Sequence, residues 1–408
     1  MARKRLFGNG FELPPKPIQS NIMTFWAIST TLLSAALAVA EPEAAAIQWV
    51  EGLGGKLTYD AAQHVTAVDL GDCGGRDADL KHLAAFKQLT KLRLWGPDIS
   101  DAGMAAVAPL VQLTDLTLEN TGVDDDGLKQ LTLLKNLKSI NLRRSGVSDK
   151  GLTLVHEFPH LEQLHLLYTR TSDAGLNNIA GLTKLRLLDL RGCARISDAG
   201  LKALAGLPNL ERLKLRNPGV SDSGLKYVAQ LRKLKGLTLE DTSIDDSGLQ
   251  LLKDLSNLDE FHLMRCSGVS DEGLDILAGF PKLKQLSLRD IPLSGKCLVH
   301  VAKMPNLARL DLNETQVNDS ALAPLKDLKN LERLELWHTH VTDAGLSSLA
   351  GLAKLQVLNL EDTAITDAGL KSLYGLTQLK ELTLKLTKAT AEGMKQLQQA
   401  LPRLKIET

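Results

Sequence analysis

Residues 194–217 of this 408-residue chain have the sequence ARISDAGLKALAGLPNLERLKLRN, which contains two different apolar periods. In the segment 213–215 (LKL) the leucines are spaced by two, as in a strand with one buried face. Leu201, Leu204 and Leu207 are spaced by three, as along one side of a short helix. The stretch therefore predicts a strand, a turn and a short helix, each with one apolar face.

The same pattern recurs along most of the chain. Its L-x-x-L-x-L segment begins at Leu89, Leu113, Leu137, Leu161, Leu185, Leu210, Leu234, Leu258, Leu283, Leu307, Leu331, Leu355 and Leu379. A degenerate copy starts at Val65, and the array has about 14 units of 24–25 residues. One unit alone cannot bury both of its apolar edges, so the units are expected to stack, each covering the next.

The consensus L-x-x-L-x-L-x-x-[T/C]-x-[I/V]-[S/T/D]-D-x-G-L resembles the leucine-rich repeat, in its 24-to-26-residue, helix-containing class. The resemblance implies an α/β fold: a right-handed leucine-rich-repeat solenoid, or horseshoe, with parallel strands on the concave face and short helices on the convex face. The repeat pattern of this chain is similar to those of F-box adaptor proteins and of exported bacterial leucine-rich repeat proteins.

The recurring phrase SDAGL, as at residues 197–201, could suggest a phosphate loop, a metal loop or a catalytic acid. A catalytic acid is needed once, whereas this phrase occurs in nearly every unit. Ser197 is well placed as a helix N-cap, and Asp198 adds negative charge at the positive end of the helix dipole. Gly200 lacks a side chain where the turn passes close to the adjacent coil. We interpret the phrase as structural.

Composition narrows the function classes. Lys+Arg and Asp+Glu are balanced at 48 each, which gives no global attraction to nucleic acid or an anionic membrane. Residues 1–40 combine Arg3, Lys4 and Arg5 with an apolar run at 25–40 that ends in Ala-Val-Ala. These features predict a cleaved signal peptide, with an uncleaved membrane anchor as the alternative and Met23 as an alternative start.

The remaining domain boundaries follow from the array. We expect an N-terminal cap at 41–64, made of a helix at 42–53 and a strand at 56–59 that turns back into the first repeat. The array spans 65–396, and 397–408 closes the other end. The four cysteines are too few for a disulfide scaffold. Three of them occupy a slot that is threonine in other units, so burial is expected; whether Cys266 could meet Cys297 is left open.

Three motifs suggest metal chemistry but fit the repeat better. Residues 156–160 (HEFPH) match the zinc-protease pattern H-E-x-x-H, but Pro159 would end the helix that such a site needs. His338 and His340 would need partners such as Asp362 or Glu314 from neighbouring strands. Residues 124–127 (DDDG) lack the alternating ligands of a calcium loop. We predict no catalytic residue, no cofactor and no metal, and therefore no enzyme.

Function is then expected on the concave face, where outward strand residues are free to vary. Arg, Trp, Tyr and Met are the residue types that anchor interfaces. The candidate partner-binding residues are Trp95, Arg143, Arg144, His165, Tyr168, Arg191, Arg212, Lys214, Arg216, Met264, Arg265, Arg289 and Trp337.

The predicted function is an exported, non-catalytic binding or scaffold protein of the cell envelope, periplasm or medium. We expect a monomer that recognises a protein, or alternatively an anionic glycan, without nucleic acid and without a membrane span after cleavage. The second hypothesis is a substrate-recognition adaptor resembling the F-box proteins of ubiquitin ligases.

Overall fold

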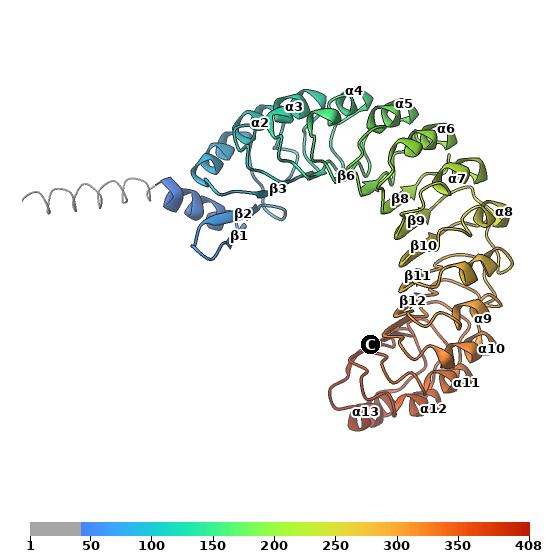
Figure 1. Cartoon of the computed structure of the whole chain (residues 1–408). Helices are drawn as coiled ribbons and strands as arrows, with labels where there is room; N and C mark the ends of the chain where they lie inside the picture. The colour runs from blue at the N-terminus through green and yellow to red at the C-terminus, as the bar shows by residue number, and fades with distance from the viewer. Residues whose placement is uncertain (1–41) are drawn as a thin grey trace, which may run out of the picture.

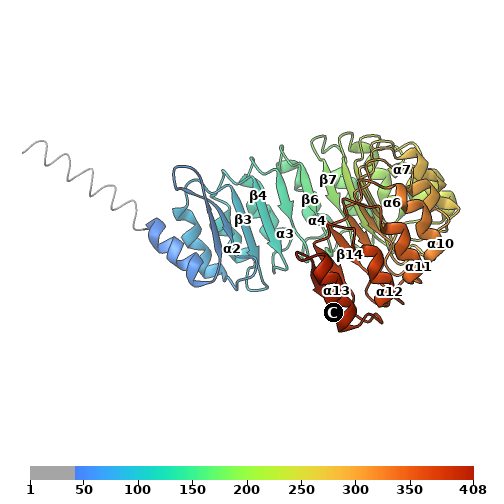
Figure 2. The same cartoon turned by 90° about the horizontal axis from the view of Figure 1, so that it is seen from below.

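The computed structural model describes residues 42–408, and these residues form one curved sheet of 16 strands that follow one another in chain order. Figure 1 shows the sheet lining the inside of an arc, with short helices along the outside, and Figure 2 shows the same arc from below. The predicted α/β solenoid, with strands on the concave face and helices on the convex face, is confirmed.

The strands pair in parallel except at the N-terminal edge, where β1 and β2 are antiparallel. They are β1 (Lys56–Tyr59), β2 (Val65–Asp69), β3 (Lys91–Trp95), β4 (Asp115–Glu119), β5 (Ser139–Asn141), β6 (Gln163–His165), β7 (Leu187–Asp189), β8 (Arg212–Arg216), β9 (Gly236–Glu240), β10 (Glu260–Met264), β11 (Gln285–Ser287), β12 (Arg309–Asp311), β13 (Arg333–Glu335), β14 (Val357–Asn359), β15 (Glu381–Thr383) and β16 (Lys405–Glu407).

The convex side carries short α-helices, many of them continued by a 3₁₀ turn. The α-helices are α2 (Asp101–Val107), α3 (Asp125–Gln130), α4 (Asp149–Leu152), α5 (Asp173–Leu176), α6 (Asp198–Leu201), α7 (Asp222–Val228), α8 (Asp246–Gln250), α9 (Leu298–Val301), α10 (Asp319–Leu322), α11 (Asp343–Leu346), α12 (Asp367–Leu370) and α13 (Ala391–Ala400). The 3₁₀ helices are η1 (Asp77–Ala85), η2 (Leu131–Leu133), η3 (Val155–Glu157), η4 (Asn177–Ile179), η5 (Lys202–Gly206), η6 (Gly273–Gly279), η7 (Ala323–Asp327), η8 (Ser347–Leu349) and η9 (Lys371–Leu373).

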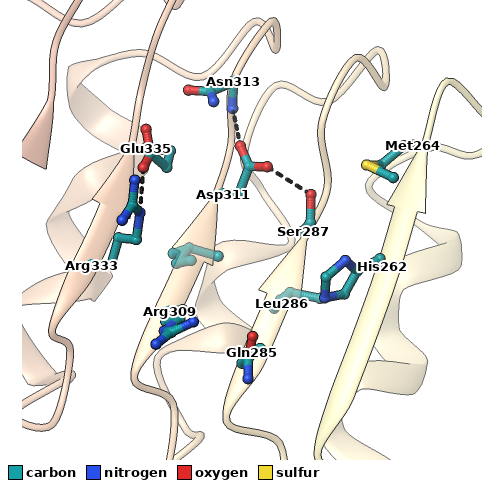
Figure 3. Close-up of a pocket in the computed structure, with 11 residues that line it drawn as sticks. His262, Met264, Gln285, Leu286, Ser287, Arg309, Asp311, Asn313, Arg333 and Glu335 are labelled. Atoms are coloured by element: carbon teal, nitrogen blue, oxygen red, sulfur yellow. Dashed lines mark hydrogen bonds and ion pairs between the residues drawn. The ribbon is translucent and has the colours of Figure 1, made fainter. Parts of the chain in front are cut away.

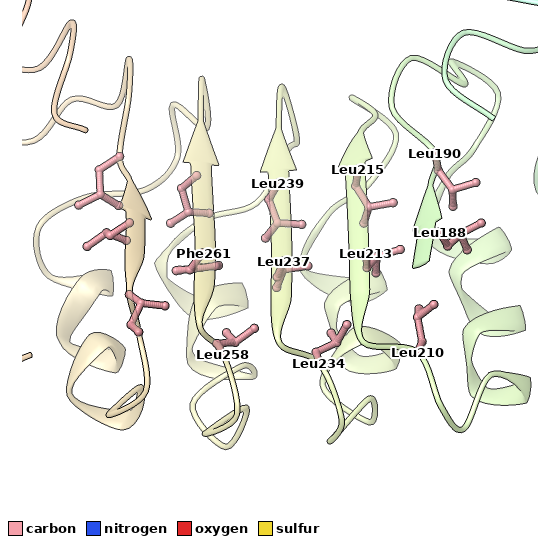
Figure 4. Close-up of a cluster of buried hydrophobic side chains, with 14 of the residues drawn as sticks. Leu188, Leu190, Leu210, Leu213, Leu215, Leu234, Leu237, Leu239, Leu258 and Phe261 are labelled. Atoms are coloured by element: carbon pink, nitrogen blue, oxygen red, sulfur yellow. The ribbon is translucent and has the colours of Figure 1, made fainter. Parts of the chain in front are cut away.

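The core is a continuous ladder of leucines between the sheet and the helices. Leu188, Leu213 and Leu237 lie opposite one another on β7, β8 and β9, and each is fully buried. Figure 4 shows these side chains projecting to the same side of their strands. Each coil thus covers the apolar edge of the next, which is why the array needs no large aromatic core.

The repeated SDAG phrase joins consecutive coils as well as capping helices. Ser197 caps α6 by accepting a hydrogen bond from the Ala199 backbone N–H, as predicted. The aspartate does more than the predicted dipole interaction. The Asp173 carboxylate accepts hydrogen bonds from both the N–H and the hydroxyl of Ser197 in the next coil, at 2.7 and 2.6 Å. A Cβ on Gly200 would lie 2.3 Å from Asp173 Oδ1, so glycine leaves room for that carboxylate.

This aspartate ladder is interrupted once along its length, and it ends where the last unit has Ala391. Gly295 stands where other units have the aspartate, and it has a positive φ of 93°. In the next coil the usual glycine is replaced by Ala321, whose Cβ lies 2.5 Å from where a Cβ on Gly295 would be. The two replacements accompany each other because no carboxylate needs the space that Ala321 fills.

The two ends are covered. A helix at residues 42–52 buries Ala46 and Val50, and β1 pairs with β2 in antiparallel orientation. Trp49 from this helix stacks on His82 with ring centroids 5.4 Å apart. At the other end, α13 and β16 cover the last leucines of the array. The predicted signal segment lies outside the described residues.

Cys73, Cys193 and Cys266 are buried, as predicted. Cys297 is buried as well, and all four thiols are free, so Cys266 and Cys297 form no disulfide. Cys193 Sγ lies 3.0 Å from the Leu166 carbonyl oxygen, in the position that threonine takes elsewhere. Within residues 42–408, no helix combines the length and apolarity needed to cross a membrane.

Candidate binding surface on the concave face

Alternation along each strand gives the concave face three rows of outward side chains. On β8 the buried residues Leu213 and Leu215 separate Arg212 in the first row, Lys214 in the middle row and Arg216 in the third row. Because neighbouring strands are parallel and in register, equivalent residues of successive coils lie side by side along each row.

All 13 candidate residues from the sequence lie on this face or at its upper border. Arg212 is in the first row, and His165 and Lys214 are in the middle row. The third row contains Trp95, Arg143, Arg191, Arg216, Met264, Arg289 and Trp337, at or just beyond the strand ends. Arg144, Tyr168 and Arg265 begin the turn that follows. The sequence pattern thus placed these residues on one face, but it did not indicate which of the arginines are paired with carboxylates.

The arginines of the central strands are instead paired with carboxylates. Arg191 makes a bidentate pair with Asp189, with Nε–Oδ1 at 3.0 Å and Nη2–Oδ2 at 2.7 Å. Asp241 accepts from Arg216 Nε at 2.6 Å and from Arg265 Nε at 2.7 Å. These partially buried pairs lower the pKa of Asp241, chiefly through the Arg265 hydrogen bond.

Two glycines let long side chains cross a neighbouring coil. Tyr168 lies over Gly192, where a Cβ would be 2.3 Å from its ring, and its hydroxyl accepts a hydrogen bond from Arg216 at 2.6 Å. Arg212 crosses Gly236 in the same way and pairs with Glu260 on β10. β9, which begins at Gly236, is buried along its whole length, including its outward positions.

The same pairing continues away from the centre. Arg143 pairs with Glu119 at 2.8 Å, and Arg289 pairs with Glu314 at 2.6 Å. The Arg289 guanidinium also lies 5.1 Å from the centroid of the Trp337 ring. The concave face is therefore a nearly neutral network of arginine, carboxylate and aromatic groups.

The turn after each strand has a backbone geometry that the sequence did not reveal. The second residue beyond the L-x-L segment takes a left-handed conformation in most coils, with φ of 52° at Arg144, 58° at Tyr168 and 53° at Arg265. This conformation is uncommon for residues other than glycine. It turns the chain away from the sheet, so these side chains form the upper border of the face rather than its floor.

Two histidines of the middle row are kept neutral by burial. Desolvation lowers the pKa of His165, and the nearby Asp189 opposes that effect only in part. Desolvation likewise lowers the pKa of His262, although Glu260 favours its charged form. At neutral pH both imidazoles therefore serve as uncharged hydrogen-bonding groups.

A hollow of about 420 Å³ lies beside the arginine network, over β10 to β13. Figure 3 shows its lining. Asp311 accepts from Ser287 Oγ at 2.8 Å and from the Asn313 N–H at 3.0 Å, and Arg333 pairs with Glu335 at 2.6 Å. Of the lining residues only Met264 was a candidate from sequence. Arg309 and Arg333 stand immediately before the second leucine of L-x-x-L, which is the first-row position, and this position in the sequence pattern could have identified them.

The metal-like motifs are separated by the fold. η3 ends at Glu157, Phe158 is buried, and His160 lies in the return loop, where Lys184 Nζ is 2.8 Å from its Nδ1. His338 pairs with Asp362 at 2.5 Å, while Glu314 is held by Arg289. Among the described residues no group of three or more His, Cys, Asp or Glu side chains is arranged to hold a metal ion.

Comparisons with known proteins agree with this architecture. A family model described as leucine rich repeat matches residues 329–388, and a second matches residues 181–205. An internalin of Listeria monocytogenes is 21% identical, with 85% of this chain and 90% of that chain covered and a TM-score of 0.52. A leucine-rich repeat protein of Leptospira interrogans is 20% identical, with coverages of 80% and 92% and a TM-score of 0.52.

A further structure, internalin C2 of L. monocytogenes, is 30% identical over 50% of this chain and 83% of its own, with a TM-score of 0.39. No curated protein sequence matches the chain.

Proposed function

The chain belongs to the leucine-rich repeat family, and on that premise we propose that it is a non-catalytic scaffold that holds a protein partner against its concave sheet. One observation carries the proposal. The concave face presents a continuous sheet with exposed aromatic groups, among them Trp95 at 37% and Tyr168 at 39% exposure, beside a network of paired charges that includes Tyr168. Exposed aromatics in a preorganised polar setting are the usual anchors of protein interfaces.

The charge pairing favours a protein over an anionic glycan. A polyanion needs uncompensated cations, and most arginines of this surface already face its carboxylates: Arg143, Arg191, Arg216, Arg265 and Arg289. A protein surface of mixed charge can bind such a network without first separating these pairs. We therefore propose a protein as the partner and keep an anionic glycan as the second candidate.

Export belongs to the same proposal and is supported by the sequence of residues 1–40, with its basic start, apolar run and Ala-Val-Ala end. The test is to express the full chain in an export-competent cell and to determine the mass and first residue of the product outside the cytoplasm. A product that begins at Glu41 would support export with cleavage, and retention of the full chain in the cytoplasm would contradict it.

Partner binding is tested with residues 41–408 as bait in extracts of the native envelope or medium. The concave variant carries Tyr168→Ala and Trp337→Ala. The control carries Leu133→Ala and Leu251→Ala, which remove exposed apolar groups from the convex side. The captured protein should bind the concave variant at least about tenfold more weakly and the control unchanged. An equal loss in both variants, or a loss only in the control, would contradict concave recognition.

A further inference from the structure

The hollow over β10 to β13 contains hydrogen-bond donors, on Gln285 and Arg309, that form no side-chain hydrogen bond within residues 42–408. His262 Nε2 also lacks a hydrogen-bond partner there, but it is closed off from solvent and lies 3.4 Å from the Glu260 carboxylate. Figure 3 shows Gln285 and Arg309 along the same margin of the hollow with no interaction to the other residues drawn. These three residues lie on consecutive strands, β10, β11 and β12. The other polar groups, such as Ser287 and Asp311, bond to one another.

We propose that this margin is a subsite for an acidic side chain of the protein partner, whose carboxylate accepts hydrogen bonds from Arg309 and Gln285. The inference rests on the proposed function and specifies the chemistry of its partner. A guanidinium offers paired N–H groups that match the two oxygens of a carboxylate, and the glutamine amide adds two further donors.

The charges around the subsite are compatible with this occupant. Arg309 and Arg333 lie side by side in the first row, because β12 and β13 are parallel and in register. Glu260, 3.4 Å from His262 Nε2, is neutralised by Arg212. Asp311 is already bound by Ser287 and by the Asn313 N–H, on the opposite side of the hollow from the first row. Met264 lines the same hollow at its other margin, in the third row of β10.

The test uses two capped tripeptides as probes, acetyl-Gly-Glu-Gly-amide and its glutamine isostere, titrated into ¹⁵N-labelled protein. The glutamate peptide should cause saturable shifts of the Arg309 Nε–H and Gln285 side-chain amide signals, and the glutamine peptide should cause little change. Arg309→Gln should weaken glutamate-peptide binding about tenfold, the value of a charge-assisted hydrogen bond of about 1.4 kcal/mol. Arg333→Gln is the matched control, since it removes the same charge one strand away from an arginine already paired at 2.6 Å.

Smaller losses in Arg333→Gln than in Arg309→Gln would support the subsite, and equal losses would overturn it, because they would mean general attraction to positive charge. Equal binding of the two peptides, or no binding of either, would also overturn it. The proposed function is judged separately by the capture experiment with the Tyr168 and Trp337 variant, so the two ideas can fail independently.

Discussion

At the scale of single residues, the aspartate and glycine of each SDAG phrase act on different neighbours. Asp125 accepts from the N–H and hydroxyl of Ser148 in the following coil, at 2.8 and 2.6 Å. A Cβ on Gly151 would lie 2.4 Å from Asp125 Oδ1. The glycine leaves room for the carboxylate of the preceding coil, and the natural pair of Gly295 and Ala321 shows the opposite combination. One coil differs, because Cys297 stands in the glycine position and its N–H bonds Asp271 at 2.9 Å.

A double-mutant cycle tests this dependence. Gly151→Ala should destabilise the protein by about 2 kcal/mol, because the added methyl group displaces the Asp125 carboxylate. In an Asp125→Ala background the same change should cost about 1 kcal/mol less, since the obstructing oxygen is absent. Urea unfolding of the four proteins provides the measurement. Additive effects would show that glycine is needed there for another reason.

In one coil the N-cap residue is Asp124 rather than serine, so its carboxylate faces the ladder carboxylate of Asp101. Burial raises the pKa of Asp101, and the neighbouring Asp124 adds to the shift. A raised pKa means that the folded state holds the proton more tightly. The contribution of Asp101 to stability is therefore complete below its ordinary pKa of 3.8 and is lost as pH rises through the raised value.

Asp124→Ser should therefore stabilise the protein at neutral pH by roughly 0.5 kcal/mol, a value reduced for partial exposure of the pair. The gain should shrink as pH falls toward 3.8, the ordinary pKa of Asp101. Unfolding free energies of both proteins between these pH values provide the check, with Ser148→Asp as the reverse substitution. A gain that does not change with pH would exclude the carboxylate pair as its cause.

At the scale of elements, each coil is stabilised mainly by its two neighbours. Leu188 on β7 is fully buried between the coils that carry β6 and β8. The aspartate ladder ties the same coils together on the convex side through Asp173 and Ser197. Loss of one contact layer should therefore weaken a limited region of the array.

Leu188→Ala should destabilise the array by about 3 kcal/mol, and Leu188→Asp should unfold its region because it buries an unpaired charge. Native-state hydrogen exchange on the alanine variant should accelerate in β6 to β8 and remain near wild type in β13 to β15. A uniform increase over the whole chain would show that the array unfolds as one cooperative unit.

At the scale of the whole molecule, the arc depends on its covers. The C-terminal segment formed by α13 and β16 lies against β15 and α12, where Leu382 and Leu370 are fully buried. The N-terminal cover buries Ala46 and Val50 in the same way. The ends of a solenoid would otherwise present its apolar core to water.

Deletion of residues 389–408 should lower the melting temperature and expose apolar surface that binds a hydrophobic dye. The truncated protein should also self-associate as its concentration rises, which light scattering would detect. As a control, solution scattering of residues 41–408 should give a curved, elongated particle. A truncated chain that stays monomeric and binds no dye would show that the segment is not a cover.

The sequence by itself determined the repeat, the strand and helix of each unit, the N-caps and the concave position of the candidate residues. It could do so because these features depend on local periods that recur in every unit, as in the segment 213–215. It also indicated burial of Cys193, because the slot is threonine elsewhere.

Only the tertiary structure decided which charges are neutralised and where unused donors remain. Arg212 meets Glu260, 48 residues away, by crossing Gly236 on the strand between them. The hollow beside Arg309 likewise depends on which side chains of β10 to β13 bond to one another. These pairings depend on how far long side chains extend across neighbouring strands of the curved sheet. The repeat period of the sequence contains no information on that distance.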